Sequence, residues 1–500
     1  ASPPPLLQLQ TTMTNADLLN YIDGAYRPAL GAQTFEKLAP ATGEVLLRVA
    51  ASQREDVDLA VGAARAALKS GAWAQCSGAQ RSRLINRLAD LLESNASQLA
   101  GLLADEQGRP RGDMLMMDLP MSVDTLRYFA GWADKLEGRT IPTAGFMDKQ
   151  TLNYTRLAPV GVAALIVPWN APLMITIWKL APALAAGCTV VIKTSEDAPV
   201  AVGQLGELIS AAGIPSGVVN IVHGIGSEAG AALTSHADVQ KISFTGSTEV
   251  GRWIAREAAG SFKRVTLELG GKAAQVVFAD ADVDAAVQGV AMGLFVNQGQ
   301  TCAAGSRILV HRSLLHTFER RLVELADQIQ LVGPDAPPGP PWVQMGALIS
   351  QRHLQRVQAC VQRAMAEGAT LLTRRSQTPT GAGFYLRPTV FTGVTPQMSI
   401  AREEIFGPVG ALIPFDDESE AIALANDTRY GLSASLWTRE LGLAHRVADR
   451  LDVGAVAVNC WSPLDARLPW GGGKDSGQGR DLSSKALSSY LEEKVVTLAL

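Results

Sequence analysis

The stretch that decides the fold is residues 160–193, VGVAALIVPWNAPLMITIWKLAPALAAGCTVVIK. Its first part, residues 160–167, is an uninterrupted apolar run, as expected for a strand buried on both faces. Residues 173–186 have the length and composition of a helix, and residues 189–193 (TVVIK) form a second short apolar run. A strand, a helix and another strand in this order predict one unit of a parallel α/β sheet.

The same alternation continues beyond this stretch. Residues 200–212 are expected to form a helix, and strands are expected at 218–222 (VVNIV), 241–244 (KISF) and 264–268 (RVTLE). Five strands joined by crossover helices predict a doubly wound sheet, which binds ligands beyond the C-terminal ends of its strands.

Further elements are expected before and after this sheet in the sequence. Two long helices precede it, at 55–69 and 79–103. A second α/β region follows from about residue 273, with strands at 274–278 and 307–310 and helices at 314–330 and 351–367.

Two segments fit neither α/β region: residues 137–154 and the tail 490–500, YLEEKVVTLAL. The tail alternates like a strand, and a strand at the end of a chain is an exposed edge unless another subunit covers it. We interpret the tail as an assembly element; the alternative is a strand added to a sheet of its own chain.

Composition narrows the class of protein. The chain has 500 residues, 47% of them hydrophobic and 18% charged, with a net charge of −4, which argues against nucleic acid or an anionic membrane as the main partner. No apolar run is long enough to span a bilayer, and residues 1–12 do not form a secretory signal. Five scattered cysteines indicate free thiols in a cytoplasmic protein, and the six histidines suggest no metal site.

Cys302 lies in the sequence NQGQTCAAGS, residues 297–306, directly after an apolar helical run. A helix end and nearby backbone N–H groups can lower the pKa of a thiol and hold an oxyanion beside it. We therefore expect Cys302 to be a nucleophile; the alternative is a free cysteine packed in the core.

Polar groups follow the ends of two expected strands. Asn170, in Pro168-Trp169-Asn170, can donate a hydrogen bond to a substrate oxygen. Lys193 and Glu196 are spaced to bind two ribose hydroxyls, although a surface ion pair is an alternative explanation.

Two further strands end in similar groups. Residues 244–251 (FTGSTEVG) combine a strand end with a helix start between Gly246 and Gly251, where backbone amides and Ser247 can hold a phosphate. Glu268 ends the strand RVTLE, before two glycines, and can serve as a general base, although it could instead be a solvated loop glutamate.

Together these groups resemble the motifs of the aldehyde dehydrogenase superfamily, over roughly residues 20–497. Seven motifs occur in the family's order and spacing: PWN (168–170), KTSE (193–196), FTGSTEVG (244–251), ELGGK (268–272), NQGQTC (297–302), EIFGPV (404–409) and PWGGGKDSG (469–477).

The resemblance implies an enzyme that oxidises an aldehyde to a carboxylic acid through a Cys302 thioester. Glu268 would activate the hydrolytic water, and Asn170 with the Cys302 N–H would form the oxyanion hole. Lys179 matches a lysine that assists proton relay. Family members that pass the acyl group to coenzyme A generally lack the glutamate, so hydrolysis is expected. Other readings are a catalytically silent structural or binding protein of this fold, or a thiol hydrolase of esters.

The resemblance also implies NAD as cofactor. Lys193 and Glu196 would bind the adenine ribose, and Ser247 and Trp169 the pyrophosphate. The other residues expected at the cofactor are Gly246, Gly251, Leu269, Glu404 and Phe406, the last two at the nicotinamide and its ribose. Because a carboxylate repels a 2′-phosphate, Glu196 favours NAD over NADP, with NADP as the alternative.

The implied architecture is a Rossmann-like doubly wound cofactor domain, an α/β catalytic domain and a small β arm. The expected divisions are an NAD-binding domain at 14–136 and 160–269, a catalytic domain at 270–477, a bridging arm at 137–159 and 478–500, and a loose N-terminal lead-in at 1–13. The arm would join a homo-oligomer, either a dimer or a dimer of dimers (a homotetramer).

Eleven positions match the family's substrate tunnel: Met121, Ala171, Met174, Ile175, Trp178, Val296, Thr301, Ala303, Trp461, Leu464 and Trp470. None is Arg or Lys, so a second carboxylate on the substrate would have no cationic partner there. Ala171, Val296 and Ala303 are small and leave room. We expect a medium-sized apolar aldehyde, aromatic or branched; a carboxylated semialdehyde is the alternative.

Overall fold

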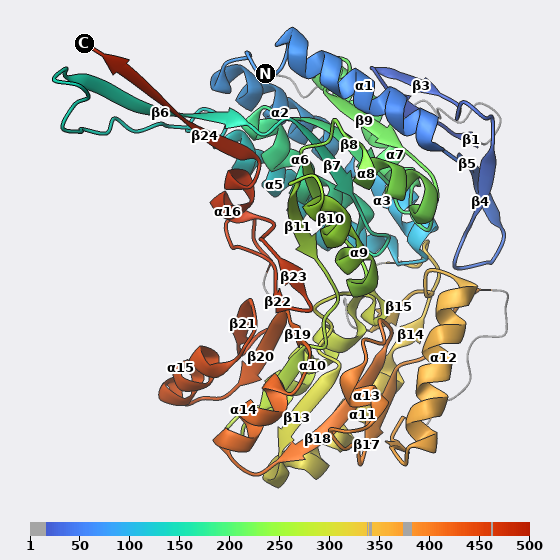
Figure 1. Ribbon diagram of the computed structural model, residues 1–500. Helices are drawn as coiled ribbons and strands as arrows, with labels where there is room; N and C mark the ends of the chain where they lie inside the picture. Colours follow the sequence, from blue (N-terminus) through green and yellow to red (C-terminus); the bar gives the residue numbers. More distant parts are fainter. Residues whose placement is uncertain (1–16, 338, 340–342, 374–382, 462–463) are drawn as a thin grey trace.

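The computed structural model describes residues 17–337, 339, 343–373, 383–461 and 464–500. The expected N-terminal lead-in, residues 1–13, lies outside the described residues. Two α/β lobes are stacked on each other, and a two-stranded ribbon projects from the upper lobe (Figure 1). Every helix in the described part of the chain is too short or too polar to cross a lipid bilayer.

The upper lobe is built on an eight-stranded sheet in the order β23-β11-β10-β7-β8-β9-β2-β3. All five predicted strands form its parallel centre: β7 (Val162–Ile166), β8 (Thr189–Lys193), β9 (Val219–Val222), β10 (Lys241–Thr245) and β11 (Arg264–Glu268). The chain runs outward from β7 to β9 and then returns to β10 on the other side of β7. This order confirms the doubly wound fold, and it places the ligand crevice beyond the ends of β7 and β10.

The edges of this sheet are antiparallel strands that the sequence did not predict: β23 (Gly477–Gln478), β2 (Asn20–Ile22) and β3 (Ala25–Arg27). A separate three-stranded sheet lies beside them, with β1 (Asp17–Leu18), β4 (Thr34–Leu38) and β5 (Val45–Ala50).

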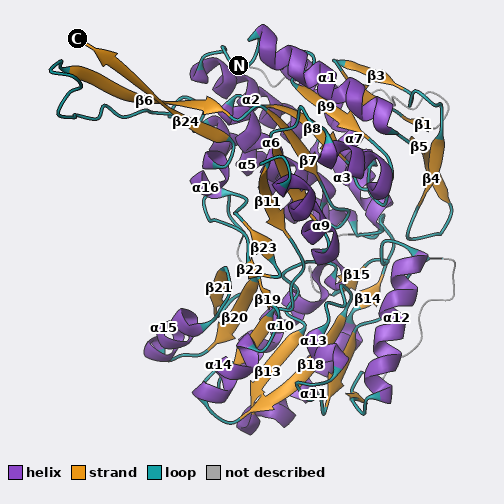
Figure 2. Ribbon diagram, viewed as in Figure 1, coloured by secondary structure: helices purple, strands orange, loops and turns teal. Residues whose placement is uncertain are grey.

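Helices cover both faces of the sheet because its central strands are apolar on both sides (Figure 2). One face packs against α1 (Arg54–Ser70), α8 (Ala231–Ser235) and α9 (Thr248–Ala259). The other packs against α2 (Gly78–Ser94), α3 (Ala96–Gln107), α5 (Leu119–Ala130), α6 (Pro172–Ala186) and α7 (Val200–Ala212).

The prediction of one continuous helix over residues 79–103 is wrong. Asn95 separates α2 from α3, with a non-helical backbone at φ −101° and ψ 12°. Its side-chain Nδ2 donates to the Leu91 carbonyl at 2.7 Å, which satisfies a carbonyl at the end of α2.

The lower lobe contains a seven-stranded sheet: β16 (Thr370–Leu371), β17 (Thr389–Thr392), β18 (Val409–Phe415), β13 (Arg307–His311), β12 (Ala274–Val277), β20 (Ser433–Trp437) and β21 (Ala455–Val458). One face packs against α10 (Val283–Phe295) and α11 (Leu315–Gln328). The other packs against α12 (Gln351–Ala366), α13 (Ser399–Arg402), α14 (Glu418–Asn426) and α15 (Leu441–Arg450).

The projecting ribbon consists of β6 (Thr151–Pro159) and β24 (Leu491–Ala499), paired antiparallel along their whole length. The tail of the chain therefore pairs with a segment of its own chain, and this two-stranded sheet is separate from both large sheets (Figure 1). Helix α16 (Ser483–Ser488) precedes β24 and packs on α6 at the root of the ribbon.

Candidate active site

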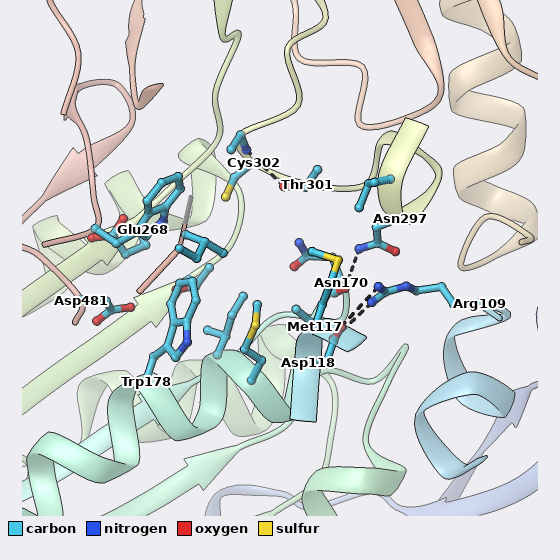
Figure 3. Close-up of a pocket in the computed structure, with 18 of the residues that line it drawn as sticks. Arg109, Met117, Asp118, Asn170, Trp178, Glu268, Asn297, Thr301, Cys302 and Asp481 are labelled. Atoms are coloured by element: carbon cyan, nitrogen blue, oxygen red, sulfur yellow. Dashed lines mark hydrogen bonds and ion pairs between the residues drawn. The ribbon is translucent and has the colours of Figure 1, made fainter. Parts of the chain in front are cut away.

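Cys302, Glu268 and Asn170 line one pocket with an empty volume of about 740 Å³. Glu268 is the last residue of β11, Asn170 follows β7, and Cys302 lies in the loop after the short 3₁₀ turn η4 (Val296–Gly299). Figure 3 shows the Cys302 sulfur pointing into the cavity between Glu268 and Asn170. Three residues far apart in the sequence are thus brought together at one cavity.

The Asn170 amide is fixed by the loop that carries the cysteine. Its Nδ2 donates to the Gln300 carbonyl at 3.0 Å, and Asn297 Nδ2 donates to the Asn170 carbonyl at 2.7 Å. An amide nitrogen carries two hydrogens, so one of them holds Asn170 to the loop and the second is left for another acceptor.

The loop before Cys302 has a strained backbone. Asn297 and Gln298 adopt left-handed conformations, with φ of 53° and 56°. The Gln300 side chain ties the loop to the neighbouring segment, because its Oε1 accepts from the Ile349 N–H at 2.9 Å. Strain of this kind persists only where surrounding contacts hold it, as in many catalytic loops.

The expectation that the pKa of Cys302 is lowered by a helix end is wrong for this structure. Burial, Glu404 and Glu268 raise the pKa of the thiol to about 12, although the N–H groups of Ala303 and Cys302 itself act in the opposite direction. The preceding helix α10 presents its C-terminus, not its N-terminus, to this loop, so its dipole does not favour a thiolate. Cys302 is therefore a protonated thiol in the free protein.

Glu268 is buried, with 4% of its surface exposed, and neither carboxylate oxygen has a hydrogen-bond partner among the described residues. Burial and the nearby Asp481 raise its pKa well above the usual value, while Lys179 and Arg480 act to lower it. A buried carboxyl group without partners is available to a water or substrate, and its raised pKa makes it a stronger base once ionised.

Lys179 does not line the pocket, unlike the other three expected catalytic residues. Its Nζ lies behind the wall, in a fully buried ion pair with Asp481 Oδ2 at 2.7 Å, and it also donates to Ser243 Oγ at 3.2 Å. Asp481, which the sequence analysis did not single out, lines the pocket and connects Lys179 to it.

A groove with an empty volume of about 1670 Å³ lies at the crevice beyond β7 and β10. The expected residues Trp169, Lys193, Glu196, Gly246 and Ser247 all line it. Lys193 Nζ lies 3.1 Å from Glu196 Oε2. Although burial opposes it, Lys193 holds the pKa of Glu196 below its usual value, so the carboxylate is charged at neutral pH.

The start of helix α9 forms part of the wall of this groove. Ser247 is the N-cap of α9, and its Oγ accepts from the Val250 N–H at 3.3 Å. Gly251 does not line the groove: a Cβ there would lie 2.4 Å from Leu269 Cδ2, so this glycine permits close packing of α9 on Leu269. Gly251 therefore packs α9 against Leu269 and does not line the groove where the sequence predicted a cofactor contact.

A smaller chamber connects the groove to the catalytic pocket. It is lined by the expected residues Trp169, Ser247, Leu269, Glu404 and Phe406, together with Asn170 and Cys302. Glu404 Oε1 accepts from the Gly271 N–H at 3.0 Å, and burial raises the pKa of Glu404 to about 7. Cys302 and Asn170 are therefore shared between the chamber and the pocket.

Of the eleven expected tunnel residues, all except Met121 line the pocket. Met121 packs instead against the apolar cluster around the pocket, which contains Ala171, Trp178 and Trp470. The pocket also has lining residues that the sequence analysis missed: Arg109, Met117, Asp118, Thr245, Asn297 and Asp481.

One of these additional residues is an arginine, a residue type that is absent from the eleven expected positions. Arg109 is buried in the pocket wall, and its two Nη atoms donate to the Asp118 carboxylate at 3.2 and 3.3 Å. Asp118 ends a π-helical turn, η2 (Met114–Asp118), and no family motif marks this segment. The two charges neutralise each other, so the wall carries no free cation at Arg109 (Figure 3).

Comparison with known proteins identifies the family. The model of the "Aldehyde dehydrogenase family" matches residues 26–496. Aldehyde dehydrogenase 1A1 of Gallus gallus is 43% identical, over 100% of this chain and 96% of that protein. The NAD+ complex of an aldehyde dehydrogenase from Bacillus cereus superposes with a TM-score of 0.93 at 42% identity, covering 97% of both chains. An indole-3-acetaldehyde dehydrogenase from P. syringae, solved with NAD+ and IAA, superposes with a TM-score of 0.92 at 39% identity, again over 97% of both chains. This chain belongs to the aldehyde dehydrogenase family.

Proposed function

We propose that this protein oxidises an aldehyde to a carboxylic acid with NAD, through a covalent intermediate on Cys302. The observation that carries the proposal is the convergence of Cys302, Glu268 and Asn170 on a pocket that opens, at Cys302 itself, into the chamber at the end of the cofactor groove. A nucleophile, a base and a hydrogen-bond donor thus face a site where substrate and cofactor can meet.

The residues of the groove fit NAD. Lys193 and Glu196 would hold the adenine ribose, the N-terminus of α9 with Ser247 would hold the pyrophosphate, and Glu404 would hold the nicotinamide ribose. The relatives from Bacillus cereus and P. syringae were solved with NAD+. When bound, the nicotinamide supplies a hydride acceptor and a positive charge beside Cys302.

In the first half of the reaction the Cys302 thiol passes its proton to a water molecule in the pocket, and its sulfur forms a bond to the aldehyde carbon. The carbonyl π electrons move to the oxygen, which accepts hydrogen bonds from the second Asn170 hydrogen and the Cys302 N–H. Donors placed in this way are worth about 3 to 4 kcal/mol each in the transition state. When the oxyanion collapses, the hydride leaves and a thioester remains on Cys302.

In the second half Glu268 acts as a base. It takes a proton from a water molecule while the water oxygen attacks the thioester carbon, and the carboxylic acid leaves as the Cys302 sulfur regains its electrons. The partnerless carboxylate of Glu268 supports this role, and Asp481 with Lys179 offers a route for the proton away from the pocket.

We propose a medium-sized apolar aldehyde, aromatic or branched, as substrate. The pocket wall is formed mainly by apolar side chains, with small residues at Ala171, Val296 and Ala303. Arg109 does not favour a carboxylated semialdehyde, because the Asp118 carboxylate already balances its charge; its Nε, which has no hydrogen-bond partner among the described residues, remains a donor for a neutral polar group. The P. syringae relative is named for indole-3-acetaldehyde, an aldehyde that carries an aromatic ring.

The division of the chain is part of the same proposal. The NAD-binding domain would comprise residues 14–136 and 160–269, the catalytic domain 270–477, and the arm 137–159 and 478–500. The ribbon of β6 and β24 would join subunits of a homo-oligomer, because it projects from the body (Figure 1) and its strand β24 is exposed along most of its length.

A panel of aldehydes with NAD, followed by the absorbance of the reduced nicotinamide, tests the proposed function. Aromatic and branched aldehydes should give a higher kcat/KM than acetaldehyde or succinic semialdehyde. A best substrate with a second carboxylate would reject the substrate class, and the absence of NAD reduction with every aldehyde would reject the activity.

A further inference from the structure

Helix α12 holds the backbone of the loop that carries Glu404 and Phe406. His353 Nε2 lies 2.7 Å from the Phe406 carbonyl oxygen, and Arg356 Nη2 donates to the Glu404 carbonyl at 3.0 Å. The two side chains are one helical turn apart, and the two carbonyls are two residues apart. One helix of the lower lobe therefore binds the loop at both residues that line the chamber next to Cys302.

Phe406 needs such support because its backbone is left-handed, with φ of 60°. This conformation is unusual for a bulky side chain and persists only where neighbouring groups enforce it. The next residue is also tightly packed: a Cβ at Gly407 would lie 2.8 Å from Val357 Cγ1 on the same helix.

The left-handed backbone places the Phe406 ring against Trp169. The two ring centroids lie 5.2 Å apart with an interplanar angle of 84°, and the His353 ring lies 5.4 Å from Trp169. Trp169 and Phe406 line the chamber, whereas His353 lies behind them and does not line it. The chamber wall is thus an aromatic pair backed by a histidine.

His353 is a constant hydrogen-bond donor in this position. It is 8% exposed, and burial lowers its pKa to about 4, with Arg356 and Arg352 acting in the same direction and the Phe406 carbonyl acting against it. The neutral ring has one N–H, and a carbonyl can only accept, so that proton lies on Nε2.

We propose that His353 is a positioning residue for hydride transfer: its bond to the Phe406 carbonyl holds that residue in the left-handed conformation that sets the chamber wall beside Cys302. The inference rests on the proposed function, because it concerns where the nicotinamide lies relative to the aldehyde carbon. His353 acts through Phe406 and does not itself touch the reacting atoms.

The test compares three variants of the full-length enzyme. His353→Leu removes the donor at similar volume, His353→Gln replaces it with an amide N–H, and Gln358→Leu, on the exposed face of α12, is the matched control. Three quantities are measured: the single-turnover rate of reduced-nicotinamide formation, the KM for NAD, and the Kd for AMP, which occupies only the adenosine end of the groove.

We expect His353→Leu to slow the single turnover at least fivefold and to raise the KM for NAD, with the Kd for AMP within twofold of wild type. His353→Gln should recover most of the rate, and Gln358→Leu should match wild type. If His353→Leu does not fold, His353→Asn takes its place, because the shorter amide does not reach the carbonyl.

A single-turnover rate for His353→Leu within twofold of wild type would overturn the inference, as would a glutamine variant no better than the leucine variant. An equal loss of AMP and NAD binding would also overturn it, because this would indicate a general loss of structure. A wild-type enzyme that reduces no NAD with any aldehyde would instead overturn the proposed function, so the two failures are distinguishable.

Discussion

At the residue scale, Cys302 and Glu268 have different tasks, and substitutions should separate them. Cys302→Ala removes the atom that forms the covalent bond, so oxidation of every aldehyde should be lost. Glu268→Gln leaves hydride transfer intact but removes the base, so it should give a burst of reduced nicotinamide and then turnover slowed about 10²- to 10⁴-fold. Stopped-flow absorbance measures both phases. Near wild-type turnover by Cys302→Ala, or undiminished steady turnover by Glu268→Gln, would require a different assignment.

The protonated thiol gives a pH dependence that can be measured without substrate. The pKa of Cys302 is raised to about 12, so in the free enzyme its thiolate fraction should rise about tenfold for each pH unit above neutrality. The rate of iodoacetamide labelling at Cys302, followed by mass spectrometry, should rise in the same proportion between pH 7 and 9. The exposed Cys460 provides an internal comparison in the same sample. A labelling rate that levels off below pH 8 would show that the thiol is activated in the free enzyme.

Glu196 should determine the choice of cofactor. Its carboxylate is charged and lies next to Lys193 in the groove, where it would accept from a ribose 2′-OH and repel a 2′-phosphate. The kcat/KM for NAD should exceed that for NADP, and Glu196→Gln should narrow the gap by about tenfold, or about 1.4 kcal/mol. Glu228→Gln removes an exposed carboxylate outside the groove wall and controls for net charge. A wild-type preference for NADP would mean that a nearby cation, such as Arg352, outweighs this carboxylate.

At the element scale, the N-terminus of α6 forms part of the substrate pocket through Ala171, Met174 and Ile175. Each CH₂ buried there contributes about 0.8 kcal/mol of binding free energy. If the space beside Ala171 is open, aromatic and branched aldehydes should therefore have a higher kcat/KM than acetaldehyde. Ala171→Phe should fill it and lower the kcat/KM for benzaldehyde-like substrates at least tenfold, with little effect on short aldehydes. Ala171→Ser changes the size only slightly and serves as the control. An equal loss for short and bulky aldehydes would show that the substitution disturbs the loop around Asn170 and not the substrate space.

The elements that could be predicted are those whose identity depends on local sequence. Central parallel strands such as β7 and β8 are buried on both faces, so they read as continuous apolar runs. The turns after these two strands carry the recognisable Asn170 and Glu196, and the end of β11 carries Glu268. Strand β23 has two residues, too few for a pattern, and the π-helical turn that brings Asp118 to the pocket has no sequence signature. The Arg109–Asp118 pair and the raised pKa of Cys302 depend on tertiary packing, which no local pattern records.

At the scale of the whole molecule, the ribbon of β6 and β24 requires an explanation, because an isolated two-stranded sheet is only marginally stable in water. Most of β24 is exposed, and it carries apolar side chains that the body does not cover, Val495 (63% exposed) and Leu498 (45%); Leu500, directly after the strand, is 72% exposed. Exposed apolar side chains on an unpaired strand edge are typical of an interface between subunits. A second copy of the chain would bury them and stabilise the ribbon.

The whole-molecule prediction follows from this exposure. Wild-type protein should have a mass in solution of twice or four times the 52.8 kDa of one chain, measured by size exclusion with light scattering. The double substitution Val495→Glu and Leu498→Glu places charges where apolar contacts are expected, so it should reduce the mass toward that of a smaller assembly. Glu493→Gln, on the same strand, removes one exposed charge but leaves Val495 and Leu498 in place, so it should leave the mass unchanged. Because the catalytic residues lie away from the ribbon, each chain should still react once at Cys302 when it is mixed with NAD and an aldehyde. An unchanged mass for the double variant, or a wild-type mass of one chain, would mean that the ribbon does not join subunits and that its exposed apolar side chains have another function.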